Sequence, residues 1–237
     1  MKLSGEVLLN RKTGHCIDSE ALGLMASRIG QVVAMGAEVV VVLGGGNIFR
    51  GLSGAQDGIG RTTGDYMGML ATVINALALQ NALEGQGVQV RVQSAISMHE
   101  VAEPYIHRRA MRHLEKGRVV IIAAGTGNPY FSTDTAAALR ASEVGADVLL
   151  KATKVDGIYT ADPMKNPKAK RYATLTYRDA LTQNLRVMDS AAFALCMENK
   201  ISIIVFDFFQ KNQLERAILG KPVGTLVSDF ETSTLYE

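Results

Sequence analysis

The sequence contains only two cysteines, Cys16 and Cys196, and they lie far apart in the chain. Their spacing matches no metal-binding or redox motif, so we interpret both as reduced thiols of a cytoplasmic protein. The net charge of +2 is too small to indicate binding to nucleic acid or to an anionic membrane. The composition, with 47% hydrophobic and 20% charged residues, is that of an ordinary globular protein.

Secretion and membrane signals are also missing. The first ten residues, MKLSGEVLLN, lack the apolar core of a signal peptide. No apolar run approaches the roughly 20 residues that a membrane-spanning helix needs. A chain of 237 residues suits one large domain or two small ones. We therefore expect a cytoplasmic protein that binds neither membrane nor nucleic acid.

Segments with helical periodicity alternate with short apolar segments along nearly the whole chain. Helices are expected at residues 19–35, 65–84, 101–116, 133–144, 188–200 and 211–219. Strands are expected at residues 38–43, 88–93, 118–124, 147–151, 201–206 and 225–228. This alternation predicts an α/β fold, with a mostly parallel sheet covered by helices on both faces.

The ends and core of two of these helices are specific enough to predict. Asp18 is the expected N-cap and Gly36 the expected C′ residue of the first helix. The expected core positions of the second helix are Met69, Val73, Leu77 and Leu83.

The polar segment 152–186 is an exception to the alternation, and we interpret it as a long excursion. The break near residue 150 suggests lobes 1–150 and 151–237 within one domain, although one continuous sheet fits equally well.

The segment GGGNIFRG, residues 44–51, follows an apolar strand directly. Ligands bind outside the carboxyl ends of parallel strands, and glycines there let backbone N–H groups approach phosphate oxygens. Arg50 adds a planar, permanently charged group suited to phosphate. Taken alone, the segment fits a tight turn without a ligand as well as it fits a phosphate site.

Two further loops, KLSGE at 2–6 and GTGNPYFST at 125–133, have the same glycine-rich character. Together the three loops indicate a site for phosphates or nucleotides along one edge of the sheet. Neither G-x-x-x-x-G-K-[ST] nor G-x-G-x-x-G occurs. The sequence therefore excludes a P-loop nucleotide site and a standard dinucleotide site.

Several segments resemble the bacterial uridylate kinases (UMP kinases) of the amino acid kinase superfamily. Those segments are KLSGE, GGGNIFRG, RTTGDYMGMLATVINALALQ at 61–80, GTGNPYFSTDTAAALRA at 125–141, LLKATKVDGIYTADP at 149–163 and VMDSAAFALCMENKISIIVF at 187–206. The resemblance covers nearly the whole length. It implies a three-layer αβα sandwich that forms a single amino acid kinase domain over residues 1–237, with an acceptor lobe and an ATP lobe.

The resemblance also implies transfer of the γ-phosphoryl group of ATP to UMP, giving UDP and ADP in pyrimidine nucleotide biosynthesis. Such transfer depends on positioning and electrostatics. Lys2 would hold the transferring group, Arg50 would contact phosphate oxygens, and Asp134 would orient Lys2. The implied ATP-binding residues are Lys2, Leu3, Ser4, Gly5, Gly46, Arg50, Thr153, Tyr159 and Asp162. The implied UMP-binding residues are Gly45, Asp65, Thr126, Gly127, Asn128, Pro129, Tyr130, Phe131, Ser132 and Thr133.

Most of these side chains also have a structural interpretation. Lys2 could be a solvated terminal lysine, and Asp65 and Asp134 could each be the N-cap of a helix. Tyr159 could belong to the core and Asp162 to an Asp-Pro turn. Lys151 and Lys154 are interpreted as solvated side chains, and His99, His107 and His113 as surface or interface residues because their spacing matches no metal motif.

Cofactors and partners follow from the resemblance as well. Mg²⁺ is expected with ATP, and the sequence identifies no direct protein ligand for it. The chain is expected to form a homo-oligomer, by resemblance a hexamer. GTP and UTP are possible effectors. We do not assume activation by GTP, because Gln80 and Glu84 stand where basic residues would suit a nucleotide phosphate.

The start of the chain departs from the family pattern. Relatives carry an apolar strand before KLSGE, whereas only Met1 precedes Lys2 here. We expect a version extended by about 8 residues, one ordinary strand, to be more stable or more active.

Two other functions remain open from the sequence. One is an amino acid kinase with a different small acceptor, against which the uracil-facing loop 126–133 argues. The other is a non-catalytic protein that stores nucleotides or oxyanions on the same fold. Lys2, Arg50, Asp65 and Asp134 together favour catalysis.

Overall fold

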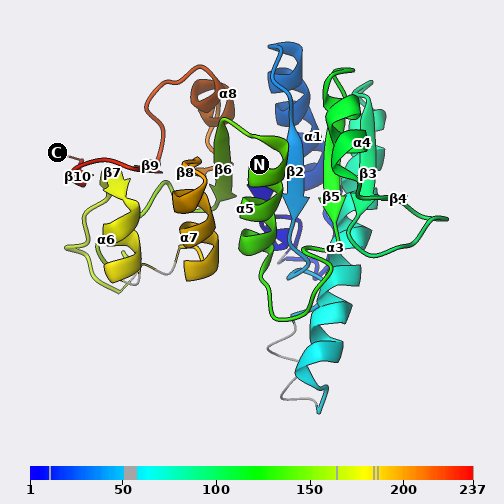
Figure 1. Ribbon diagram of the computed structural model, residues 1–237, viewed down its shortest axis with the longest axis horizontal. Coiled ribbons are helices and arrows are strands. Elements are labelled where there is room, and N and C mark those ends of the chain that lie inside the picture. The colour runs from blue at the N-terminus through cyan, green and yellow to red at the C-terminus, as the bar shows by residue number, and fades with distance from the viewer. Residues whose placement is uncertain (11, 51–57, 164, 184, 186, 237) are drawn as a thin grey trace. The chain divides into compact units, whose positions relative to one another are not determined.

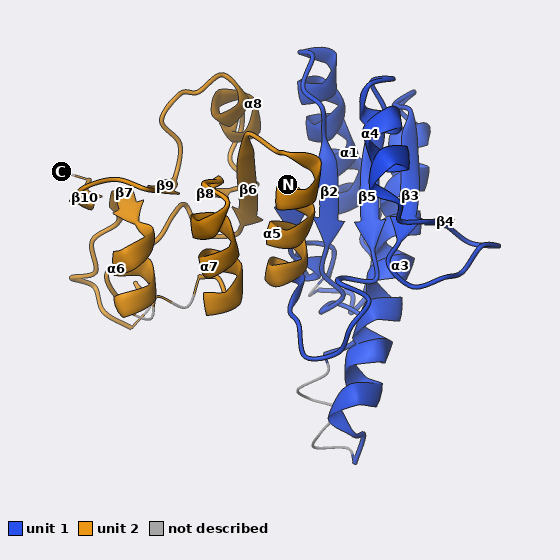
Figure 2. Ribbon diagram, viewed as in Figure 1, with its two compact units in different colours: residues 1–133 blue, residues 134–237 orange. Residues whose placement is uncertain are grey.

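The computed structural model describes residues 1–10, 12–50, 58–163, 165–183, 185 and 187–236. The chain forms two compact units, residues 1–133 and residues 134–237 (Figure 2). Each unit is built around strands that are flanked by helices.

Unit 1 contains five strands in the order β1-β2-β5-β3-β4, all paired in parallel. Its elements are β1 (Lys2–Leu3), the 3₁₀ helix η1 (Gly5–Val7), α1 (Ser19–Ala34), β2 (Val40–Leu43), α3 (Arg61–Glu84), β3 (Val90–Ser94), β4 (Glu103–Pro104), α4 (His107–Leu114) and β5 (Val119–Ala123). The parallel order requires a crossover between successive paired strands, and α1 and α3 provide two of them.

Helices cover both faces of the unit 1 sheet. Helix α3 packs on β2, β3 and β5 and also contacts α1, whereas α4 packs on β5. Figure 1 shows α1 and α3 behind the strands and α4 in front of them. This is the arrangement that right-handed crossovers produce, because the chain moves one way along the sheet through α1 and α3 and back through α4.

The central strands of unit 1 are buried along their length. All five residues of β5 are buried, as are the last three of β2. Their Val- and Ile-rich sequences are typical of parallel strands covered on both faces. Helix α1 contributes Met25, Ile29 and Val32 to this core.

Unit 2 contains strands in the order β10-β7-β9-β8-β6. Its elements are α5 (Thr133–Val144), β6 (Val148–Thr153), β7 (Tyr172–Thr176), α6 (Tyr177–Thr182), α7 (Ser190–Glu198), β8 (Ser202–Asp207), α8 (Gln213–Ile218), β9 (Thr225–Ser228) and β10 (Thr234–Leu235). The pairs β6–β8 and β7–β9 are parallel, whereas β8–β9 and β7–β10 are antiparallel. The predicted α/β class with a mostly parallel sheet flanked by helices is therefore confirmed.

Several predicted details are also confirmed. The Asp18 side chain caps α1 by accepting a hydrogen bond of 2.8 Å from Ala21 N. Gly36 follows α1 with a φ of 93°, the left-handed conformation expected at C′.

Three predicted elements differ from the structure. The helix predicted at 65–84 begins at Arg61, because Arg61 and Asp65 pair across its first turn and Gly60 is the N-cap. The helix predicted at 101–116 is limited to α4, because Pro104 favours an extended residue before it and β4 forms there. The segment 152–186 contains β7 and α6, which pack through tertiary contacts that its polar sequence did not indicate.

In the middle of helix α3, the buried residues differ from the expected ones. Leu77 was predicted to lie in the core but is only half-buried, and Leu79 and Ala76 are the buried residues there. By length and composition α3 is the one helix in the described part of the chain that could cross a membrane, with 44% of the relevant window buried. Its packing on three strands is that of a core helix.

Candidate active site

A cavity of about 260 Å³ lies within unit 1, beside the loops that follow β2 and β5. Its lining includes eight of the predicted site residues, namely Gly45, Gly46, Arg50, Asp65, Thr126, Phe131, Ser132 and Thr133. It also includes six residues that were not among the individually predicted site residues, namely Phe49, Gly64, Gly68, Met69, Thr72 and Gly125. Phe49 and Gly125 lie in two of the predicted glycine-rich loops, whereas the other four belong to α3. Gly64 and Gly68 lie one helical turn apart, and this spacing could have indicated that α3 lines the site. Without side chains at these two positions, one face of α3 is open to a neighbouring loop.

The glycine loop after β2 lies directly on α3. A Cβ atom at Gly45 would come within 2.7 Å of the carbonyl oxygen of Gly68 and 2.8 Å of Ala71 Cβ. Glycine is therefore required at position 45 by close approach, as the sequence suggested. Gly51, the last residue of the GGGNIFRG segment, lies outside the described residues.

The KLSGE loop meets the same glycine loop. Strand β1 pairs with β2 so that Lys2 lies opposite Val42 and Leu3 opposite Leu43. Gly44 N donates a hydrogen bond of 2.9 Å to Leu3 O. A Cβ at Gly5 would lie 2.5 Å from Gly44 O. Two of the three predicted loops are therefore in contact, and Lys2 belongs to a paired strand rather than to a frayed end.

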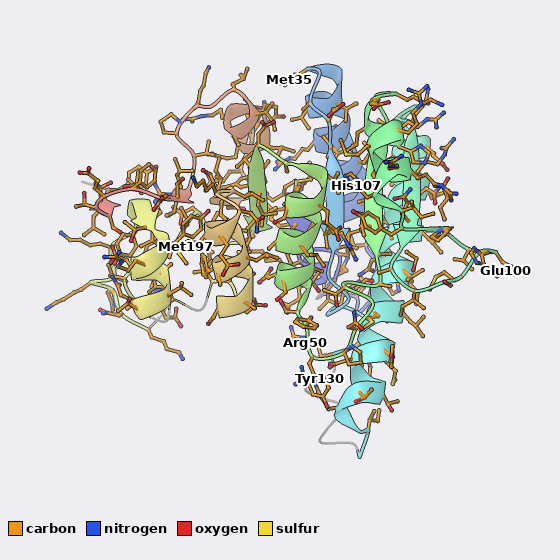
Figure 3. All side chains as sticks on the ribbon, in the orientation of Figure 1. Met35, Arg50, Glu100, His107, Tyr130 and Met197 are labelled. Carbon is orange, nitrogen blue, oxygen red and sulfur yellow. The ribbon has the colours of Figure 1, made fainter. Side chains whose placement is uncertain are left out.

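Arg50 lines the cavity. Its guanidinium forms an ion pair with Glu6, a contact that the sequence did not predict, and its Nε donates to Gly46 O at 3.4 Å. The side chain is 56% exposed. Figure 3 shows Arg50 and Tyr130 at the same lower end of unit 1. Because a guanidinium carries five N–H donors, the pair with Glu6 leaves others for an anion.

Asp65 holds the loop that follows β5. Its carboxylate accepts hydrogen bonds from Arg61 Nε at 2.8 and 3.0 Å and from Tyr130 N at 2.8 Å. The alternative interpretation of Asp65 as an N-cap is wrong, because the helix begins four residues earlier. The Arg61 guanidinium also lies 5.3 Å from the Tyr130 ring centre, within the range of a cation–π contact.

The loop 124–133 has an unusual backbone. Ala124, Gly125, Gly127 and Tyr130 all have positive φ, at 61°, 60°, 82° and 73°. Non-glycine residues seldom adopt this conformation, and they tend to do so at functional sites. Thr126 Oγ1 bonds the backbone of Asn128, accepting from N and donating to O, both at 3.2 Å.

The side chains of this loop are only partly gathered at the cavity. Tyr130 and Phe131 are 68% and 54% exposed. Phe131 lines the cavity, whereas Gly127, Asn128, Pro129 and Tyr130 are not part of its lining. The sequence prediction that the whole run 126–133 wraps a base stays a prediction.

In unit 2, Asp134 is the second residue of α5 and not its N-cap. Its Oδ2 accepts a hydrogen bond of 2.5 Å from Lys151 Nζ, on β6. The two side chains are only 15% and 8% exposed. The interpretation of Lys151 as solvated is therefore wrong, and its place at the fourth position of the buried strand β6 explains why.

The predicted adenosine residues also lie in unit 2. Thr153 ends β6, and its hydroxyl donates to Val155 O at 2.6 Å and accepts from Val155 N at 3.0 Å. Tyr159 is half-buried and donates through its hydroxyl to Asp156 at 2.8 Å, and this hydrogen bond raises the pKa of the phenol. Asp162 is exposed and its carbonyl accepts from Asn166 N at 2.8 Å, as an Asp-Pro turn predicts.

The histidines give one correction. His99 and His107 are exposed as predicted, but His113 is buried. Its Nε2 lies 3.0 Å from Glu103 and its Nδ1 lies 3.1 Å from Arg118. Burial raises the pKa of Glu103, but hydrogen bonds from His113 and Gln93 outweigh it and the net shift is downward. Among the described residues, no three His, Cys, Asp or Glu side chains gather to hold a metal ion.

Solved structures of nucleotide kinases resemble this chain over nearly its full length. A UMP kinase from Bacillus anthracis is 41% identical, with 100% of this chain and 97% of that chain covered and a TM-score of 0.96. A UMP kinase from Ureaplasma parvum is 40% identical, with 96% and 97% covered and a TM-score of 0.90. A uridylate kinase from Archaeoglobus fulgidus is 31% identical, with 95% and 97% covered and a TM-score of 0.73.

The sequence also matches a family model directly. The model describes the amino acid kinase family and matches residues 1–207, which include β1, the three glycine loops and β6 to β8. With the full-length structural similarity, this match shows that the chain belongs to the amino acid kinase family.

Proposed function

We propose that this protein is a UMP kinase, which transfers the γ-phosphoryl group of ATP to UMP and produces UDP and ADP. The observation that carries the proposal is the cavity of unit 1, which combines a glycine loop, Arg50 and Asp65 with both ends of the loop 125–133. The similarity to UMP kinases from two bacteria over nearly the full chain supports the same function.

Unit 1 supplies the groups that would bind the acceptor. The backbone at Gly45 and the Arg50 guanidinium can receive phosphate oxygens, because both present N–H donors. Asp65 can accept from the sugar hydroxyls. The run 126–133 supplies Thr126, Asn128 and backbone groups that could match the fixed donor and acceptor edge of uracil. A site built this way rejects other bases by leaving buried groups unpaired.

Donor groups are proposed from both parts of the chain. Lys2, Leu3, Ser4, Gly5 and Gly46 would hold the ATP phosphates. Thr153, Tyr159 and Asp162 would hold adenosine. Residues 151–237 would therefore serve the adenosine part of ATP, and residues 1–150 would serve the acceptor together with the ATP phosphates. Asp134, already paired with Lys151, would organise the cationic side of the reaction. Because both reactants are anionic, the positive charges of Lys2 and Arg50 would neutralise charge as the phosphoryl group transfers.

Mg²⁺ fits this donor set as a companion of ATP. Magnesium keeps several waters and binds through one or two carboxylates together with substrate phosphates. Asp134 is the proposed carboxylate, through a water molecule, since one of its oxygens is bonded to Lys151. The metal would supply charge neutralisation at the β- and γ-phosphates.

We further propose a cytoplasmic homo-oligomer, a hexamer by its resemblance, acting in pyrimidine nucleotide biosynthesis. Helix α3 supports self-association, because Tyr66, Leu70 and Ile74 are 44%, 51% and 48% exposed and recur at a spacing of four residues. Such an apolar stripe on a helix is more often covered than left in water. GTP and UTP are proposed as effectors to be tested. Activation by GTP is not assumed, because Gln80 and Glu84 bond each other at 3.0 Å and offer no cation to a phosphate.

The test is ADP release from Mg-ATP, measured in parallel with UMP, CMP, dUMP and no acceptor. ADP formed with UMP and not without an acceptor supports the kinase. ADP formed with another small acid in place of UMP favours a related kinase. Tight ATP binding with no ADP from any acceptor favours a storage protein.

A further inference from the structure

Two buried polar residues of α3 hold the two loops that line the cavity of unit 1. They are Thr72 and Asn75, which are 4% and 0% exposed. They lie three positions apart, so both face the same side of the helix. Neither was singled out from the sequence, where they sit within an apolar helical run.

Thr72 bonds the loop that follows β5. Its hydroxyl donates to Met69 O at 2.6 Å, so the oxygen is free to accept from Ala124 N at 2.8 Å. Ala124 is fully buried and has a φ of 61°. Without the threonine oxygen its N–H would be buried without this partner, and a strained residue would lose the contact that fixes it.

Asn75 bonds the loop that follows β2. Its Nδ2 donates to Gly44 O at 2.8 Å and to Asn47 Oδ1 at 2.7 Å, and its Oδ1 accepts from Asn47 Nδ2 at 2.9 Å. Because a carbonyl can only accept, the contact with Gly44 fixes which way the amide points. Asn47 also donates to Cys16 O at 2.8 Å, which ties a third segment to the pair.

The spacing between the loops is therefore set from one helix face. Gly45 packs against Gly68 and Ala71 of α3 in the same region, so the β2 loop cannot drift toward the helix. We propose that Thr72 and Asn75 are positioning residues that set the distance between the loops 44–46 and 124–127, and through it the fit of the acceptor. This inference rests on the proposed function, because the acceptor is taken to be UMP.

The test compares Thr72→Val, which removes the hydroxyl at nearly constant shape, with Thr72→Ser, which keeps it. Thr62→Val, an exposed change on the same helix, is the matched control. We expect Thr72→Val to raise the KM for UMP about tenfold while the KM for ATP changes less than about twofold, as a misplaced binding loop would. Thr72→Ser keeps the hydroxyl, so its KM for UMP should lie close to that of the unmodified protein.

Asn75→Asp replaces the donor facing Gly44 O by an acceptor, with Asn81→Asp as the exposed control. We expect the same selective rise in the KM for UMP. If Asn75→Asp fails to fold, the Thr72 variants carry the test. A lower melting temperature with both KM values unchanged in Thr72→Val would overturn the inference, because it would reduce Thr72 to a structural role. A Thr72→Ser variant as impaired as Thr72→Val would overturn it as well.

Hydrogen exchange of the whole protein gives a readout independent of activity. Amides in the segment 124–127 should exchange about tenfold faster in Thr72→Val than in Thr62→Val, because the local structure opens more easily. Unchanged exchange would overturn the positioning role even if the KM rises. If the unmodified protein forms no ADP with UMP, the proposed function fails, and the exchange result still decides whether Thr72 holds this loop.

Discussion

Lys151 Nζ lies 2.5 Å from Asp134 Oδ2, and both side chains are largely withdrawn from solvent. Asp134 is at the start of α5 and Lys151 is on β6, so the pair joins a helix to a strand of unit 2. Removing only one partner of a buried ion pair strongly destabilises the folded protein, because the other charge stays buried without compensation.

Lys151→Met should therefore lower the free energy of unfolding by about 3 kcal/mol, and the double variant Asp134→Asn/Lys151→Met should recover part of that loss. Urea unfolding of the four proteins in a double-mutant cycle measures the coupling. Lys165→Met is the control, because its 4.0 Å pair with Asp162 is exposed, and it should change stability little. Additive effects of the two buried changes would contradict the prediction.

Gly45→Ala should lower stability by about 1–3 kcal/mol, because the new Cβ would overlap the Gly68 carbonyl and Ala71. The loop would have to move away from α3, and UMP binding should weaken with it. Gly46→Ala serves as a stability control, since a Cβ there finds no atom closer than 3.8 Å. Thermal unfolding of both variants is the measurement, and equal melting temperatures would argue against the close packing.

Asp65→Asn should raise the KM for UMP about tenfold and leave the KM for ATP nearly unchanged. The neutral amide of Asn has no charge to pair with Arg61, and the hydrogen bond that it accepts from Tyr130 N should be weaker. Steady-state kinetics with each substrate varied separately measures the effect. Glu84→Gln removes an exposed charge at the other end of α3 and should behave as the unmodified protein. A similar rise in both KM values would count against an acceptor role for Asp65.

The two cysteines should differ sharply in reactivity. Cys16 is exposed, whereas Cys196 is fully buried in α7. Burial also raises the pKa of the Cys196 thiol to about 12, so little thiolate forms at neutral pH. A thiol reagent at pH 8 should titrate one group per folded chain and two after unfolding in urea. Rapid reaction of two thiols in the folded protein would contradict this.

Stability should fall as the pH rises above 9. The folded protein keeps the Cys196 proton up to a pKa of about 12, whereas the unfolded thiol loses it near 9.0. The unfolded state therefore binds fewer protons in this window, and the free energy of unfolding decreases by up to about 1.4 kcal/mol per pH unit. Burial raises the pKa of Tyr177 too, which adds a decrease of the same sign. Cys196→Ala should show a shallower decrease between pH 9 and 11, and parallel curves would refute the assignment.

Most helices and strands were anticipated from the sequence because their periodicity is local. Alternating helical and apolar segments predicted the parallel sheet, and Asp18 and Gly36 marked the ends of α1 through the conformations those positions require. The glycine loop 44–46 was also predicted, since three successive glycines after an apolar strand indicate a backbone that another group must approach closely.

Contacts between distant segments could not be predicted in the same way. Nothing local to Thr72 or Asn75 indicates that one accepts from Ala124 N and the other donates to Gly44 O. The same holds for Lys151, whose charge looks solvated until β6 is buried and Asp134 is brought to it. Strand β7 forms because β9 and β10 pair with it, not because its own residues alternate.

The α/β class, the glycine loops and the family could be established from the linear chain, because they depend on the spacing of residues and on motifs. Which polar groups are buried, and what they bond, was settled only by folding. Burial and hydrogen bonding bring together segments far apart in the chain, and those surroundings set the free energy of a polar side chain. For that reason Thr72, Asn75 and Lys151 gained their roles from the tertiary structure alone.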